Sequence, residues 1–135
     1  MRLWHQKLLP YLPRQQLLGQ HRECCALRGK GWGRKHSVVD YVFTHKPESL
    51  VAYHYLVMNE MKRRGYNPDA RWYNCDFRGN AIGTEVGRCD SNIITGFVMA
   101  ANCCNIMIYP EHNDAYLQEC LDNLSEKGIT IDFSK

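Results

Sequence analysis

The chain has 135 residues, a length typical of one domain with an ordinary hydrophobic core. Hydrophobic residues make up 44% of it and charged residues 23%, both ordinary values for a folded globular protein. The formal charge of +3 permits nucleic-acid binding without requiring it. No apolar run approaches the ~20 residues that a membrane-spanning helix needs. Residues 1–14 contain two prolines and no continuous apolar segment, which argues against a secretory signal peptide.

Seven cysteines are present, and they include the adjacent pairs Cys24–Cys25 and Cys103–Cys104. Adjacent cysteines rarely bridge each other, so we expect free thiols in a cytoplasmic protein, most of them small core residues. A metal site is the alternative, but no C-x-x-C or H-x-x-x-H spacing occurs, and we predict neither a metal nor another cofactor. The residues that could converge on a metal are Cys75, Cys89, Cys103, Cys104, Cys120 and His112.

A first helix is predicted from Pro13 to about Arg28, after an amino-terminal arm, residues 1–12, that should lie across the body of the protein. Pro13 suits a first helical turn, where its missing N–H costs nothing. Six side chains recur at three- and four-residue steps and predict a stripe that faces a core. They are Leu17, Leu18, His21, Cys24, Cys25 and Arg28.

Glu23 falls on the opposite side of this helix, with Arg22 beside it, Gly19 one turn earlier and Gln16 two turns earlier. One carboxylate, one guanidinium and a glycine gap therefore meet where a ligand could approach. The alternative interpretation is a solvated helix face that carries an ordinary arginine and glutamate.

Residues 29–36 form a glycine-rich basic loop with one aromatic side chain. Such a loop can follow a phosphate backbone while Trp32 stacks on a base. Its spacing matches neither a Walker loop nor a dinucleotide-binding fingerprint. The alternative is a solvated turn with Trp32 in the core. The basic side chains of the loop are Lys30, Arg34, Lys35 and His36.

A second helix is predicted from Pro47, after a short apolar segment at 37–43 that could be strand or helix, and it stops at Gly65. Its end carries the basic run 62–64, which either complements the helix dipole or contacts phosphate. The expected inward stripe consists of Leu50, Tyr53, His54, Val57 and Met61.

Two further helices are predicted beyond a loop at 66–85. Asp90 and Ser91 can cap the first, and the last runs from about Asn113 until Gly128 stops it. The end of the chain is expected to be extended. These elements predict an all-α fold, a single compact domain over residues 1–135 with three to four helices and irregular connecting loops, which we expect to be a monomer.

Three segments share motifs with a known family: Met1-Arg2-Leu3 together with LLGQHRE at 17–23, His36 together with the helical segment 47–69, and IYPEHNDAYLQECLDNL at 108–124. These segments resemble the pyrimidine-dimer DNA glycosylases of the bacteriophage endonuclease V type. The resemblance implies an all-α protein whose amino terminus threads between the helices toward an Arg-Glu pair. It also implies an enzyme that removes ultraviolet-damaged bases from double-stranded DNA and then nicks the abasic strand.

In that family the nucleophile is the α-amino group of the first residue, so the resemblance points to Met1 here, with Glu23 as its catalytic partner. The chemistry is coherent, because an α-amine has a pKa of about 7.7–8.0 and is partly neutral near pH 7. A neutral amine can attack the sugar C1′ and form an imine without a metal. A nearby carboxylate can stabilise the developing cation and move a proton.

Several residues differ from the family pattern. The bulky Arg2 follows Met1, so we infer that Met1 is retained and that Arg2 takes the place of the arginine just after the nucleophile. The family's arginine three positions past the glutamate is Ala26 here, for which Arg28 could substitute. The basic loop is shorter, and the aromatic carboxyl-terminal tail is missing. The aromatic residues to consider in its place are Trp72, Tyr73 and Phe133.

The leading hypothesis is therefore a DNA glycosylase with abasic-site lyase activity on pyrimidine-dimer or abasic DNA. One alternative is a non-catalytic nucleic-acid-binding module, which Ala26 and Arg2 motivate. Another is a cysteine-based metal-binding protein. The predicted catalytic residues are Met1 and Glu23, and the predicted DNA contacts are Arg2, Arg22, Arg28, Lys30, Trp32, Arg34, Lys35 and His36.

Overall fold

The computed structural model describes residues 2–30 and 40–134. Within these ranges there is no strand, only an isolated β-bridge between Phe77 and Thr84. The α-helices are α1 (Arg14–Arg28), α2 (Pro47–Arg63), α3 (Ser91–Cys104) and α4 (Asp114–Glu126). The shorter 3-10 helices are η1 (Gln6–Tyr11), η2 (Asp40–Thr44) and η3 (Ala70–Tyr73). The prediction of an all-α fold is confirmed.

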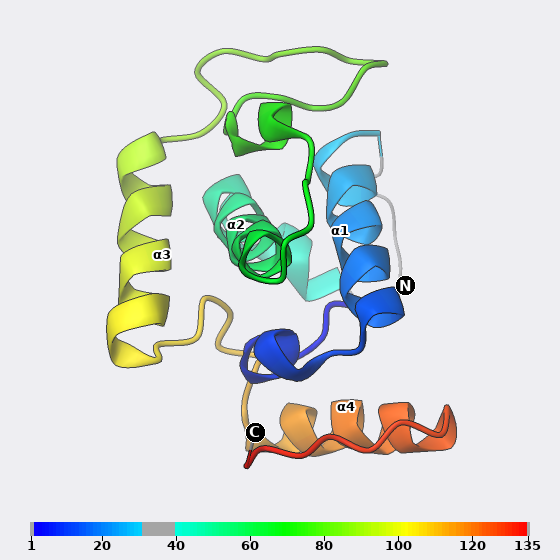
Figure 1. The fold of residues 1–135 in the computed structure, drawn as a ribbon. Coiled ribbons are helices and arrows are strands. Elements are labelled where there is room, and N and C mark those ends of the chain that lie inside the picture. The colour runs from blue at the N-terminus through cyan, green and yellow to red at the C-terminus, as the bar shows by residue number, and fades with distance from the viewer. Residues whose placement is uncertain (1, 31–39, 135) are drawn as a thin grey trace.

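Helix α2 is the centre of the arrangement. It lies between α1 and α3, while α4 lies across the end of the molecule where η1 is found (Figure 1). Eleven of the 17 residues of α2 are buried, because it has helices on several sides. Every position of its predicted stripe is among them, so the helical period read from the sequence is confirmed. None of the helices in the described ranges is long and apolar enough to cross a membrane.

The helix ends follow local chemistry. Pro13 is the residue before α1, and Pro47 is in the first turn of α2. The Asp90 side chain accepts a hydrogen bond from the Asn92 backbone at the start of α3 (2.9 Å). Asn113 caps α4 in the same way. The boundaries predicted for these helices are therefore confirmed to within a few residues.

The amino-terminal arm is part of the core rather than a strap over it. Leu3, Leu8 and Leu12 are almost completely buried. Residues 6–11 form η1, which the sequence analysis did not predict because Pro10 interrupts the apolar pattern. Arg64 holds this segment, since its Nη1 donates to the Leu12 carbonyl at 2.7 Å.

The basic run at 62–64 contributes to the fold at two of its positions. The Glu60 carboxylate accepts from Arg63 and from Arg64, at 2.7 Å for the latter, and these pairs lie at the end of α2. Of the two interpretations of this run, the structural one is thus supported for both arginines.

The cysteines differ from the expectation. All seven are free thiols, as predicted, but only Cys24 and Cys120 are buried. Cys103 and Cys104 are exposed because they lie at the last turn of α3, beyond its contacts with the core. The prediction that most cysteines are core residues is therefore wrong.

Two glycines without close neighbours test how far backbone conformation alone affects stability. Gly65 has a φ of +88° after α2, whereas Gly96 lies within α3, and a Cβ at either position would meet nothing within 4 Å. We expect Gly65→Ala to lower the free energy of unfolding by about 1–2 kcal/mol, because only the left-handed backbone opposes it. Gly96→Ala should raise it by about 0.5–1 kcal/mol. Urea unfolding measures both values. Changes of the same sign in the two variants would contradict the backbone conformations given for Gly65 and Gly96.

Candidate active site

Glu23 lies in the middle of α1, half-buried beside the start of the chain. Its Oε2 accepts a hydrogen bond from the backbone N–H of Arg2 at 3.4 Å and another from Gln20 Nε2 at 3.1 Å. Gln20 is one helical turn before Glu23, so the two side chains share a face of α1. Among the described residues no donor reaches Oε1, which leaves this oxygen for another group.

The arm is held at this carboxylate by side chains. Gln20 Nε2 donates to the Arg2 carbonyl at 2.9 Å, and the Trp4 N–H donates to Gln20 Oε1 at 2.6 Å. The Tyr53 hydroxyl donates to the Trp4 carbonyl at 2.5 Å. Residues 2–5 are in neither helix nor strand, so these side chains supply the partners that a buried backbone requires.

Met1, the predicted nucleophile, lies outside the described residues. The described chain begins at Arg2, whose backbone nitrogen lies 3.4 Å from Glu23 Oε2.

Burial controls the electrostatics of Glu23. Desolvation raises the pKa of its carboxyl group above the ordinary value. The hydrogen bond from the Arg2 backbone opposes that rise, as do the positive charges of Lys127 and Arg22. A carboxylate in such an environment can exchange a proton near neutral pH more readily than one in water.

A family model described as pyrimidine dimer DNA glycosylase matches residues 1–74, more than half of the chain. The chain belongs to this family. No curated protein and no solved structure matches it. The matched range contains the arm, α1 and α2, which are the elements that build the Glu23 site.

The positions predicted to contact DNA fall into different environments in this glycosylase family member. Arg22 and Lys30 are exposed. The Arg2 side chain is mostly covered: it lies near the rings of Trp4 and Tyr116, with its Nη1 3.9 Å from a Glu119 oxygen. Arg2 thus turns toward α4 rather than toward solvent. Trp32, Arg34, Lys35 and His36 lie outside the described residues.

Arg28 is buried, with only 4% of its surface exposed. Its Nη1 donates to the Trp72 carbonyl at 2.7 Å, and its Nη2 donates to the Asn74 carbonyl at 3.0 Å. These bonds tie α1 to the loop at 72–74. Because the guanidinium is buried and bound to these carbonyls, we do not keep Arg28 among the proposed DNA contacts.

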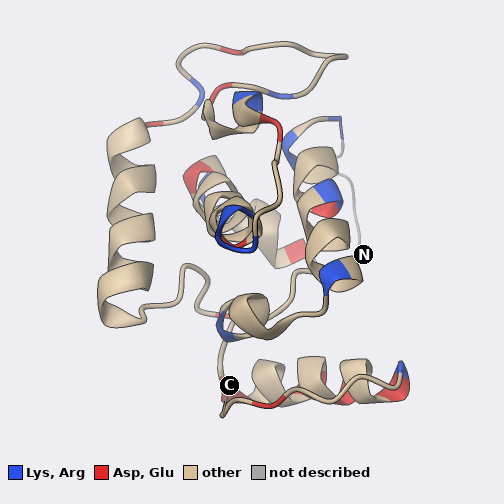
Figure 2. Ribbon diagram, viewed as in Figure 1, with Lys and Arg blue, Asp and Glu red and all other residues tan. Residues whose placement is uncertain are grey.

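Basic and acidic side chains lie on different helices. Figure 2 shows basic residues along α1 and at its carboxyl-terminal end, whereas α4 carries acidic ones. Within its helical bounds α4 has four acidic and no basic residues. A polyanion would therefore approach the α1 side of the molecule and avoid α4.

One cluster in the described ranges has the spacing of a metal site. The Nε2 of His54 lies 2.8 Å from His21 Nδ1 and 3.9 Å from the Cys25 sulfur. It contains none of the cysteines that the sequence analysis named as metal candidates. Burial raises the pKa of Cys25 to about 12, so its thiol is protonated at neutral pH.

The tautomer of His54 argues against a metal at this cluster. Arg28 Nη1 lies 2.9 Å from His54 Nδ1, and a guanidinium can only donate. His54 Nδ1 must then accept, which places the ring proton on Nε2, where it is donated to His21. A metal would have to displace this proton beside a buried cation. The cluster is therefore a chain of hydrogen bonds that links α1 to α2.

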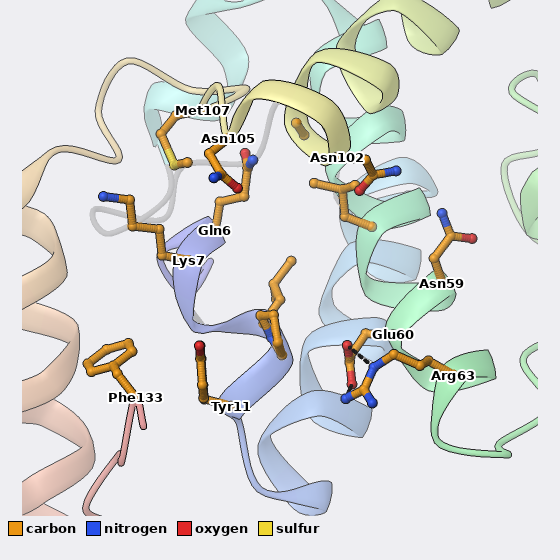
Figure 3. Close-up of a pocket in the computed structure, with 14 residues that line it drawn as sticks. Gln6, Lys7, Tyr11, Asn59, Glu60, Arg63, Asn102, Asn105, Met107 and Phe133 are labelled. Carbon is orange, nitrogen blue, oxygen red and sulfur yellow. Dashed lines mark hydrogen bonds and ion pairs between the residues drawn. The ribbon is translucent and has the colours of Figure 1, made fainter. Parts of the chain in front are cut away.

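A pocket of about 640 Å³ lies elsewhere, between η1, the end of α2 and the end of α3 (Figure 3). Several of its polar groups already have partners: Glu60 pairs with Arg63, and Asn59 accepts from a tyrosine. Gln6 binds two backbone groups of the segment at 106–108. Glu23 does not line this pocket.

His112 anchors the arm from the other side. Its Nδ1 accepts from the Gln6 N–H at 3.1 Å, and its Nε2 lies 2.8 Å from the Tyr41 hydroxyl. Burial lowers the pKa of His112 to about 3. The folded protein thus keeps this ring neutral, whereas an unfolded histidine binds a proton below about pH 6.5.

We therefore expect the free energy of unfolding to fall as the pH decreases from about 6.5 toward 3, since only the unfolded chain gains this proton. His112→Gln removes the titration. Between pH 7 and pH 5 the variant should lose about 2 kcal/mol less than the wild type does, because each pH unit is worth about 1.4 kcal/mol. Urea unfolding at the two pH values measures the difference. Equal losses in the two proteins would contradict the assigned role.

Proposed function

We propose that this protein removes damaged pyrimidines from DNA and cleaves the strand at the resulting abasic site, with the α-amine of Met1 as nucleophile. Membership of the pyrimidine dimer DNA glycosylase family supports damaged DNA as the substrate. The observation that carries the catalytic part is the hydrogen bond between the Arg2 backbone and the Glu23 carboxylate. This hydrogen bond supports a mechanism in which the Met1 amine and the Glu23 carboxylate act on the same sugar.

In the first step the neutral amine attacks C1′ of the damaged nucleotide. The bond between C1′ and the base breaks, and the base leaves with its electron pair and takes up a proton. The sugar ring then opens as the bond between C1′ and O4′ breaks, which gives an imine between C1′ and the amine and a hydroxyl at C4′. The Glu23 carboxylate stabilises the positive charge that develops at C1′ during this step.

In the second step a proton leaves C2′, which the imine has made acidic. The electrons form a double bond between C2′ and C3′, and the 3′ phosphate leaves. Glu23 accepts or relays the proton, and its raised pKa suits that task near neutral pH. Water then hydrolyses the imine and frees the amine.

The DNA is proposed to lie along the exposed side of α1. Arg22 and Lys30 would contact phosphates there. The loop that follows Lys30, with Trp32, Arg34, Lys35 and His36, would extend that contact as the sequence predicts. Reaching C1′ requires the nucleotide to leave the helical stack, which a stacking aromatic side chain can assist.

Borohydride trapping tests the nucleophile. We expect the protein with a free amino terminus to form a covalent adduct with abasic DNA, because borohydride reduces the imine to a stable amine. Acetylation of the α-amine should abolish the adduct. Intact mass spectrometry of the protein beforehand establishes whether Met1 is the first residue, and peptide mapping of the adduct locates the modified nitrogen.

Failure of the unmodified protein to form any adduct would contradict the proposal. If it bound DNA with a steep salt dependence yet gave no product, the non-catalytic binding module would be favoured instead. That alternative is motivated by the covered side chain of Arg2 and by Ala26, which lacks a charge where the family has arginine.

Substitution of the carboxylate tests Glu23. Glu23→Gln keeps the side-chain size and should lower the rate of strand cleavage by at least about 100-fold, because it removes the proton acceptor. The matched control is Glu126→Gln, the same change at an exposed position of α4. A gel assay on abasic duplex measures cleavage, and circular dichroism checks the fold. Similar cleavage by the two variants would exclude the role given to Glu23.

A further inference from the structure

Gln20 is the best-connected polar side chain beside the proposed active site. It lies on α1, one turn before Glu23, and only 1% of its surface is exposed. Its amide joins the arm, α1 and α2, since its partners come from all three. No local sequence pattern points to a role for this residue.

Three hydrogen bonds of this amide are defined by partners that can act in only one way. Nε2 has two N–H groups, which donate to the Arg2 carbonyl at 2.9 Å and to Glu23 Oε2 at 3.1 Å. Oε1 accepts from the Trp4 N–H at 2.6 Å, and it also lies 2.9 Å from the Tyr53 hydroxyl, whose single proton is closer to the Trp4 carbonyl. Both donors of the amide are therefore used, and its oxygen is paired with a backbone N–H.

These partners also fix the orientation of the amide. The backbone N–H of Trp4 can only donate, so the atom that faces it must be the amide oxygen. The nitrogen then has to face the Arg2 carbonyl and the Glu23 carboxylate. An amide rotated by 180° would place donor against donor and acceptor against acceptor.

We propose that Gln20 is a positioning residue for the proposed glycosylase and lyase reaction, setting the distance between the amino-terminal backbone and the Glu23 carboxylate. The proposal rests on the proposed function. One N–H group holds the carbonyl of Arg2, the residue after the proposed nucleophile, while the other holds the Glu23 carboxylate. A catalytic pair kept in this way loses little orientational freedom when it reacts.

Tyr53 fixes Gln20 in turn. Its ring is completely buried in α2, and its hydroxyl lies between the Trp4 carbonyl and Gln20 Oε1. The rigid central helix thereby sets the position of the amide, and the amide sets the positions of the arm and of Glu23. A glutamate at position 20 could keep the bond from the Trp4 N–H, but it would repel Glu23 and could not donate to the Arg2 carbonyl.

Gln20→Glu is the primary test, with Gln15→Glu as matched control, since Gln15 is an exposed residue of the same helix. Kinetics on abasic duplex are measured from pH 5 to pH 9. We expect Gln20→Glu to lower kcat by 10- to 100-fold with KM changed less than twofold. The acidic limb of its pH profile should move to higher pH, because a second carboxylate beside Glu23 disfavours ionisation. Gln15→Glu should leave kcat and the profile as in the wild type.

A purely structural role would give a different result. In that case Gln20→Glu would lower the melting temperature, while the folded fraction would keep the wild-type kcat and acidic limb, which would overturn the proposal. Tyr53→Phe provides a second test that does not depend on the folding of the first variant. It removes one hydroxyl but keeps the ring, and we expect kcat to fall several-fold with KM unchanged. Unchanged kinetics in Tyr53→Phe would also count against the proposal.

The proposed function and the positioning role of Gln20 would be contradicted by different results. If the wild type gives no product and no trapped adduct, the proposed function itself is wrong. If the wild type is active while Gln20→Glu and Tyr53→Phe match it in kcat and pH profile, only the positioning role is wrong.

Discussion

The structure depends on burying a stretch of backbone that belongs to no helix or sheet. Residues 2–5 pass through the interior, and each polar group there needs a partner that regular structure would normally supply. Side chains from three other elements provide these partners: Gln20 from α1, Tyr53 from α2 and Tyr116 from α4. An unpaired buried amide or carbonyl would cost about 1–3 kcal/mol, so these contacts hold the arm in one place. The position of the carboxylate at 23 relative to the start of the chain is a consequence of that requirement.

This arrangement explains which features could be read from the sequence. The helical period of α2, the cap of α3 and the ends of the helices are local signals, and the positions that they predict are close to those observed. The stripe predicted for α1 is only half confirmed, since Leu17, Cys24 and Arg28 are buried whereas Leu18, His21 and Cys25 are partly exposed. Glu23 could be singled out because a charged pair on one helix face is also local. The role of Gln20 could not, because its partners at positions 4 and 53 lie far away along the chain. Only the apolar neighbours of Gln20 on α1 hint that it is buried.

Arg28 fits two sequence patterns that predict different environments for its side chain. Its place in the apolar stripe indicated burial, while its charge and its distance from Ala26 indicated a phosphate contact. Burial prevails because the carbonyls of Trp72 and Asn74, which end the short helix η3, accept its donors. No local rule predicts where the carbonyls of a distant loop will lie. The match to the family model also ends within this loop, at residue 74.

The anchoring of the arm has a consequence for the order of folding. The Leu3 carbonyl accepts a hydrogen bond from Tyr116, 113 residues later, and the Gln6 N–H binds a ring 106 residues away. These residues of the arm are therefore synthesised more than 100 residues before the partners that they bind. Contacts of such long range are slow to form, because the entropy cost of closing a large loop comes before the contact stabilises the fold. The helices α1 and α2 can hold part of the arm earlier, but the contacts of Leu3 and Gln6 with Tyr116 and His112 form only after those two residues have been made.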